Sequence, residues 1–235
     1  MSRNRKRGVY KHVRADRLLD DLELFRPVRK VVRRTTKRVV GRFPSRKSKA
    51  MISWESQVER DFLYLLETDP EVEAFVEQPE RLRLEIDGDL HSYVPDFLIG
   101  SHQGQLWFAE VKHDDEADRP ENKAWFAAAA HACLQLNVGY RLVLESDIRR
   151  EPRLSNAKLL LRYTNIDPEH DIVVRATALV EEARMPLGAL REALGGHQRH
   201  QDVMALLLRG QIAVNLDQPL TDDSPVWLPK LGGCE

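Results

Sequence analysis

The chain has 235 residues, of which 42% are hydrophobic and 31% are charged, and its formal net charge is −1. The two cysteines, Cys133 and Cys234, lie far apart, which argues against a disulfide framework or a cysteine zinc cluster. No apolar run reaches the length of a membrane span, and the arginine-rich N-terminus lacks the apolar segment of a signal peptide. We therefore expect a cytoplasmic protein with one large domain or two small ones.

The charge is divided unevenly along the chain. Residues 1–50 contain 18 basic and 4 acidic residues, whereas the remainder contains 18 basic and 33 acidic ones. A basic arm on an acidic body is typical of nucleic-acid binding, because each neutralised phosphate releases counterions. The alternative is a solubilising tail. We predict that the arm contacts DNA through the basic residues Lys37, Arg38, Arg42, Arg46, Lys47 and Lys49.

The first predicted helix covers residues 53–67, with Ser53 as its N-cap. Val58 and Phe62 lie on one apolar stripe of this helix, and Glu55 falls on the same stripe. A carboxylate on a buried stripe needs a partner. Alternatively, Glu55 only favours the positive end of the helix dipole.

Strands rich in β-branched and aromatic residues follow this helix. They are expected at residues 72–76, 82–86, 91–99 and 106–112, with an Asp87-Gly88-Asp89 turn after the second. A charged loop at 114–120, a helix at 121–136 with Pro120 suited to its first turn, a strand at 140–145 and a helix at 155–163 complete the pattern. This order predicts an α/β core with a mixed sheet over residues 51–164.

Polar residues interrupt the two strands that flank the Gly-rich turn after Ile99. Asp96 lies in the first strand, and Glu110 and Lys112 lie on one face of the second, because side chains alternate along a strand. Neighbouring buried charges are costly unless they pair or hold a metal. A divalent cation shared with Glu55 would satisfy all three carboxylates. The alternative is an ordinary salt bridge at a sheet edge.

Residues 165–235 predict a small separate domain. Helices are expected near residues 173–184, 186–194 and 201–209, and two short strands near 210–216 and 226–228 suggest a β-wing. Three helices and a wing resemble a winged-helix module. Because the segment has little excess positive charge, we expect it to contact protein rather than DNA.

The order Glu55, Pro95-Asp96, Glu110-Val111-Lys112 resembles the signature of the PD-(D/E)xK nuclease superfamily. Flanking sequence segments extend the resemblance to the TnsA endonucleases of heteromeric cut-and-paste transposons, over roughly residues 33–163. These segments comprise Gly-Arg-Phe-Pro-Ser-Arg-Lys (41–47), Trp-Glu-Ser-Gln-Val-Glu-Arg-Asp (54–61), Glu-Gln-Pro (77–79) and Ile-Arg-Arg-Glu-Pro-Arg-Leu-Ser-Asn (148–156).

The resemblance implies a restriction-endonuclease-like core whose mixed sheet is flanked by helices. It also implies a bacterial Mg²⁺- or Mn²⁺-dependent DNA endonuclease that hydrolyses phosphodiesters near the 5′ ends of a transposon. The expected metal ligands are Glu55, Asp96, Glu110 and the Val111 carbonyl, and Lys112 would orient or activate water.

The same resemblance implies three partners: the double-stranded transposon ends, an integrase-type transposase and an ATPase regulator. Two alternatives to the transposon endonuclease remain. One is a restriction-type or junction-resolving nuclease, and the other is a catalytically silent DNA-binding assembly factor.

Overall fold

The computed structural model describes residues 39–229, so the predicted DNA contacts Lys37 and Arg38 lie outside the described residues. The described chain forms two compact units. The first contains residues up to Leu63 together with Glu71–Ile148, and the second contains Tyr64–Pro70 together with the chain from Arg149 onward. The domain boundaries given above remain predictions.

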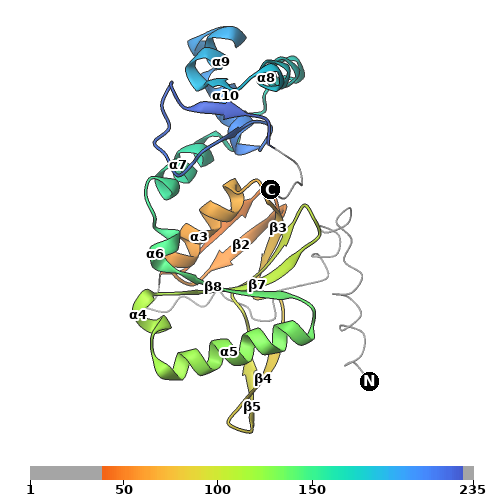
Figure 1. Ribbon diagram of the computed structural model, residues 1–235, viewed down its shortest axis with the longest axis vertical. Coiled ribbons are helices and arrows are strands. Elements are labelled where there is room, and N and C mark those ends of the chain that lie inside the picture. Colours follow the sequence, from red (N-terminus) through yellow and green to blue (C-terminus); the bar gives the residue numbers. More distant parts are fainter. Residues whose placement is uncertain (1–38, 230–235) are drawn as a thin grey trace. The chain divides into compact units, whose positions relative to one another are not determined.

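The first unit is organised around a four-stranded mixed sheet in the order β3-β6-β7-β8. The strands are β3 (Val72–Glu77), β6 (Phe97–Ser101), β7 (Leu106–Lys112) and β8 (Gly139–Leu144). The first three strands are antiparallel, whereas β7 and β8 are parallel and are joined through a crossover that contains α5 (Pro120–Gln135). The predicted mixed α/β fold with a central mixed sheet flanked by helices is confirmed (Figure 1).

Both faces of the sheet are packed, and alternate residues of each strand serve the two faces. Leu98 and Phe108 form a cluster with Ala129 and Cys133 of α5. Phe97, on the other face, meets Phe62 of α3 (Gln57–Thr68) in an edge-to-face contact with 5.8 Å between the ring centres. Burial on both faces explains why β6 and β7 read as nearly continuous apolar runs.

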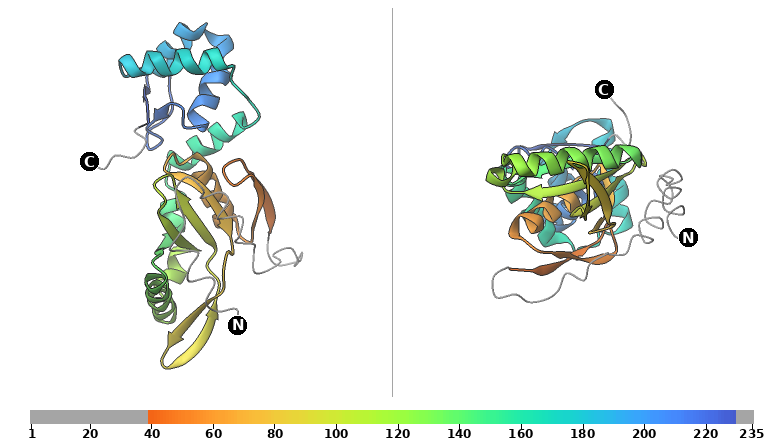
Figure 2. Two further views of the ribbon diagram at one scale, coloured as in Figure 1. Left: turned by 90° about the vertical axis from the view of Figure 1, so that its right-hand side faces the viewer. Right: turned by 90° about the horizontal axis from the view of Figure 1, so that it is seen from below.

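The hairpin of β4 (Leu82–Ile86) and β5 (Asp89–Tyr93) projects beyond the four-stranded sheet (Figures 1 and 2). Its turn residues Asp87 and Gly88 have φ angles of 54° and 85°, as the predicted Asp-Gly turn requires. The prediction of one strand over residues 91–99 is wrong. The chain leaves the hairpin after Tyr93 and enters β6 at Phe97, and the break contains Pro95, which has no N–H for a ladder.

A second hairpin, of β1 (Gly41–Ser45) and β2 (Ala50–Trp54), precedes α3. The predicted helix start at Ser53 is wrong, because Ser53 pairs with Arg42 in this hairpin. Helix α3 begins at Gln57, where the Ser56 hydroxyl accepts a hydrogen bond from the Glu59 N–H (3.1 Å), as an N-cap residue does.

Short helices follow both parallel strands of the sheet. Helix α4 (Asp114–Ala117) occupies part of the segment predicted as a charged loop, and α6 (Glu145–Ile148) follows β8. The Ser146 N–H donates to Asp114 (3.0 Å), and His113 pairs with Glu145 (2.5 Å). The carboxyl ends of β7 and β8 are thus held together by side chains.

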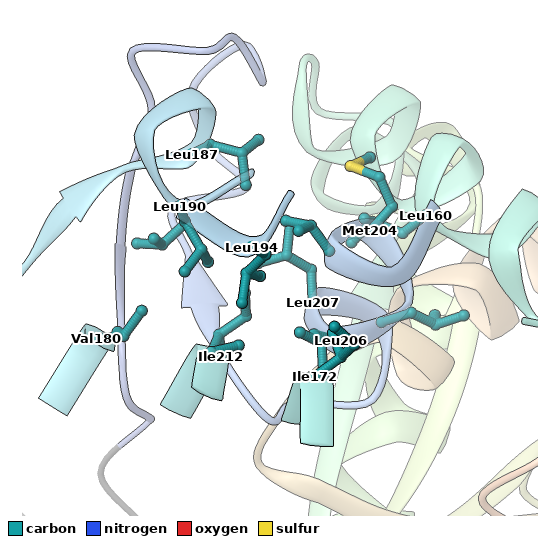
Figure 3. Packing of buried hydrophobic residues seen from close by; sticks show 14 residues of the cluster. Leu160, Ile172, Val180, Leu187, Leu190, Leu194, Met204, Leu206, Leu207 and Ile212 are labelled. Atoms are coloured by element: carbon teal, nitrogen blue, oxygen red, sulfur yellow. The ribbon is translucent and has the colours of Figure 1, made fainter. Parts of the chain in front are cut away.

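The second unit contains four α-helices and a small sheet within residues 149–229. Its elements are α7 (Arg153–Leu160), η2 (Leu161–Tyr163), α8 (His170–Glu182), β9 (Met185–Pro186), α9 (Leu187–Leu194), η3 (His197–Arg199), α10 (His200–Leu208), β10 (Ala213–Val214) and β11 (Pro225–Trp227). The strands are antiparallel in the order β10-β11-β9. Leu160, Ile172, Leu190 and Leu206 are among the fully buried residues where four helices converge (Figure 3).

Within residues 39–229, no helix is both long and apolar enough to cross a membrane.

Candidate active site

The break before β6 places Asp96 beside the end of β7. Phe97 pairs with Ala109, so Asp96 and Glu110 are the next positions along the two antiparallel strands. The Val111 N–H donates a 2.8 Å hydrogen bond to Oδ2 of Asp96. This bond fixes the Asp96 carboxylate at the point where both strands end.

Glu110 and Lys112 lie on one face of β7, as the alternation of the strand predicts. Lys112 Nζ lies 2.8 Å from Glu110 Oε1. The Glu110 side chain is 7% exposed, and that of Lys112 is 28% exposed. The pair therefore lies at the edge of the buried region, with the lysine as its more accessible member.

Two tyrosines complete the surroundings of Glu110, and nothing in the sequence pattern indicated either of them. Tyr93, the last residue of β5, donates a 2.6 Å hydrogen bond to Glu110 Oε2. The hydroxyl of Tyr140, on β8, lies 3.1 Å from that of Tyr93. Both Glu110 oxygens are thus engaged, one by Lys112 and the other by Tyr93.

Glu55 does not lie on α3, in contrast to the prediction, but in the bend between β2 and α3. Its N–H donates to Glu59 Oε2 (2.8 Å), and its Oε1 accepts from the Gln78 side-chain amide (3.2 Å). Glu59 is the helical carboxylate that acts on Asp96 and Lys112 electrostatically. Its position three residues after the cap Ser56 is the sequence signal that could have identified it.

Gln78 connects the Glu55 bend to Asp96. Its N–H donates to the Asp96 carbonyl (2.7 Å) while its side chain holds Glu55. Its φ of 42° is in the left-handed region, which costs a residue other than glycine on the order of 1 kcal/mol. Its buried Oε1 has no hydrogen-bond partner within residues 39–229.

The carboxylates of this cluster destabilise one another as anions. Loss of hydration, together with repulsion from Glu110 and Glu59, raises the pKa of Asp96 well above its usual value despite the opposing effect of Lys112. Burial likewise raises the pKa of Glu59. Burial opposes the charge of Lys112, but Glu110, Asp96 and Glu116 outweigh it and raise the pKa of Lys112.

The chemistry of these donors fits a divalent cation only in part. Mg²⁺ needs one or two carboxylates, with water and phosphate oxygens filling the remaining positions, and Asp96 and Glu110 supply two. The mutual repulsion of the carboxylates is what a bound cation would relieve. Among the described residues, however, no group of three or more His, Cys, Asp or Glu side chains is arranged to hold a metal. The set of three carboxylates predicted from the sequence is therefore not preformed.

Four of the predicted DNA contacts lie in the β1–β2 hairpin. Arg42 is on β1, and Arg46, Lys47 and Lys49 surround its turn. The Ser48 hydroxyl hydrogen-bonds to the backbone carbonyl and N–H of Phe75 on β3. The turn that carries three basic side chains is thus attached to the central sheet.

A mixed sheet with an acidic cluster and a lysine at the end of two adjacent strands is the arrangement of a restriction-endonuclease-like nuclease. Residues 69–145 match the family model described as TnsA-like endonuclease N terminal. This segment is therefore similar to TnsA-like endonuclease domains, and the resemblance inferred from the sequence is confirmed. The match includes Asp96, Glu110 and Lys112. It begins at residue 69, so Glu55 and Glu59 lie outside it. No match was found among curated proteins.

Proposed function

We propose that this chain is the metal-dependent DNA endonuclease subunit of a heteromeric transposase, which hydrolyses phosphodiesters near the 5′ ends of a transposon. The observation that carries the proposal is the convergence of Asp96, Glu110 and Lys112 inside the segment that matches TnsA-like endonucleases. A silent assembly factor would have no need of buried carboxylates that repel one another.

Asp96 and Glu110 would hold Mg²⁺ or Mn²⁺, together with the Val111 carbonyl. Glu59 and Glu55 would add a carboxylate directly or through water. When bound, the cation lowers the pKa of its water and stabilises negative charge on the phosphate. Gln78 links the Glu55 side chain to the Asp96 backbone through its two hydrogen bonds.

Lys112 orients the attacking water and offsets charge at the scissile phosphate. Its ammonium is held by Glu110 at 2.8 Å and by the fields of Asp96 and Glu116. These anions favour the protonated form, so Lys112 acts chiefly as a hydrogen-bond donor and a positive charge. Water attacks the phosphorus directly, with no covalent intermediate on the enzyme.

The basic hairpin and the arm before it would bind the DNA backbone without reading sequence. Phosphate contacts supply most nonspecific affinity and weaken steeply with salt. Replacing Arg46, Lys47 and Lys49 with glutamine should therefore flatten the salt dependence of DNA binding measured by fluorescence anisotropy. An unchanged slope would assign another purpose to the hairpin.

The second unit would be a winged-helix module that binds the transposase or the ATPase regulator. The order α8, β9, α9, α10, β10, β11 is that of a winged helix. In such modules that bind DNA, the helix in the place of α10 enters the major groove. Here residues 203–208 of α10 are buried, and residues 165–235 contain 6 basic and 11 acidic residues. Both features favour a protein partner over DNA.

The loop between β10 and β11 is also fixed by contacts within this unit. Asn156 donates to the carbonyls of Leu216 (2.9 Å) and Gln218 (2.8 Å), and Arg150 pairs with Asp217 (2.9 Å). The segment 148–156 thus holds the proposed wing, the β10–β11 loop, in place. A wing attached in this way is a rigid surface for a partner.

The proposal is tested by measuring cleavage of DNA that carries the ends of the transposon in which this chain is encoded. The transposase and the ATPase encoded by neighbouring genes are added to the reaction. We expect little cleavage by the isolated chain and double-strand excision with both partners. Asp96→Asn should lower excision by at least about 100-fold, more than the loss typical of residues behind metal ligands. Asp89→Asn, an exposed change in the β4–β5 hairpin of the same unit, is the matched control.

Two results would overturn the proposal. Efficient cutting of a defined sequence by the isolated chain would favour a restriction-type nuclease. Undiminished excision by Asp96→Asn, or by the wild type in excess chelator, would show that cleavage does not depend on the proposed metal site.

A further inference from the structure

Glu110 is held by a directed chain of hydroxyl groups. A carboxylate oxygen can only accept, so the Tyr93 hydroxyl must donate its single hydrogen to Glu110 Oε2. The 3.1 Å bond between the two tyrosines then has Tyr140 as its donor. The chain therefore runs from Tyr140 to Tyr93 to Glu110, and each bond polarises the next.

Three separate strands contribute to this chain of bonds. Tyr93 ends β5, Tyr140 lies on β8 and Glu110 lies on β7. Glu110 can rotate about its side-chain bonds, and its two oxygens are chemically equivalent. Because Tyr93 engages Oε2, the other oxygen is the one that faces Lys112 at 2.8 Å.

We propose that Tyr93, supported by Tyr140, is a positioning residue that fixes the orientation of the Glu110 carboxylate. The inference rests on the proposed function in one respect, because it takes Glu110 to be a metal ligand. Tyr93 keeps Oε1 directed toward Lys112 and the proposed cation position. Its hydroxyl also supplies a hydrogen bond in place of the water that a buried carboxylate loses. Tyr140 restricts the orientation of the Tyr93 hydroxyl through the 3.1 Å bond between them.

The test uses tyrosine-to-phenylalanine variants of the full chain, which remove one hydroxyl each and leave the ring. Tyr93→Phe should lower Mn²⁺ affinity, measured by calorimetry, by about 10–100-fold, as does the loss of partners behind metal ligands. Tyr140→Phe should act in the same direction with a smaller loss. Tyr163→Phe is the control. The Tyr163 hydroxyl also makes a 3.1 Å bond, to His200, and both residues belong to the second unit, whereas Glu110 belongs to the first.

A second measurement separates this proposal from the metal site itself. Charge-assisted hydrogen bonds are roughly twice as strong as neutral ones, so Tyr93→Phe should lower the melting temperature about twice as much in the wild type as in Glu110→Gln. Equal losses in both backgrounds would overturn the proposal, and so would wild-type Mn²⁺ affinity in Tyr93→Phe. If the wild type itself binds no Mn²⁺, the proposed function fails, and the melting comparison alone decides the role of Tyr93.

Discussion

The sheet of the first unit and the helical core of the second differ in what they bury. In the first, Glu110 is buried beside Asp96 and depends on Lys112 and Tyr93. Among described residues after Ile148, where the helical core of the second unit lies, the buried polar side chains are Asn156 and Ser224, both neutral and both bonded to backbone groups. The buried carboxylate of the second unit, Glu67, lies in its other segment, Tyr64–Pro70. Desolvating a carboxylate costs free energy that a neutral core avoids. The first unit thus loses stability where chemistry is proposed, whereas the described residues of the helical core of the second unit are apolar.

Breaking one ion pair in each unit should give the largest contrast. Lys112→Met leaves Glu110 buried without its cation, which we expect to cost about 2 kcal/mol of unfolding free energy after allowing for the partial exposure of the lysine. Arg150→Met removes a surface pair with Asp217, which Arg153 also contacts, so the change should stay within about 0.5 kcal/mol.

Denaturant unfolding of both variants measures the difference. Equal losses would mean that the Glu110–Lys112 pair is solvated like a surface pair, and the contrast between the units would disappear.

Releasing the proposed wing, the β10–β11 loop, should give a smaller effect. Asn156→Ala removes two hydrogen bonds to the β10–β11 loop and should cost about 1–2 kcal/mol. It should also weaken stimulation by the partners while leaving Mn²⁺ affinity unchanged. Asn165→Ala, an exposed change in the same unit, is the control. Full stimulation of Asn156→Ala would remove the wing from the proposed docking surface.

The sequence was sufficient for features set by neighbouring residues. The bounds of β7, the start of α5 at Pro120 and the Asp87-Gly88 turn follow from alternation, proline and left-handed turn chemistry. The pairing of Glu110 with Lys112 also follows from strand alternation. Each of these depends on contacts within a few residues.

Features that depend on distant pairing were missed. Ser53 was predicted to cap the helix because its pairing with Arg42 could not be known from the sequence. With the helix start placed too early, Glu55 was assigned to the helix and Glu59 was overlooked. Tyr93 is 17 residues from Glu110 along the chain, and nothing in the pattern connects the two. Such partners are fixed by the tertiary fold and not by local propensity.

Acid should affect the two units in opposite directions, with the smallest changes of this set. Burial raises the pKa of Glu77, so its protonated form is favoured in the folded state and the first unit gains stability as pH falls. Burial, with Arg191 and His197, lowers the pKa of His200 below 6.5, so the second unit loses stability as pH falls below that value.

Thermal melts from about pH 7.5 to about pH 4.5, the ordinary pKa of glutamate, test these signs. The melting temperature of Glu77→Gln relative to that of the wild type should decrease as pH falls. The melting temperature of His200→Gln relative to that of the wild type should increase. The same trend in both variants would contradict the assignment.

The repelling carboxylates of the first unit are proposed to form a cation site. The most direct measurement is the melting temperature of wild type and Asp96→Asn with and without Mg²⁺ or Mn²⁺. A ligand at 100 times its dissociation constant stabilises the folded state by about 2.7 kcal/mol, so the wild type should melt at a higher temperature with metal. Without metal, Asp96→Asn should melt at or above the wild type, because a desolvated and repelled carboxylate is gone, and added metal should not shift it. A wild type indifferent to metal, or an equal shift in Asp96→Asn, would contradict the claim.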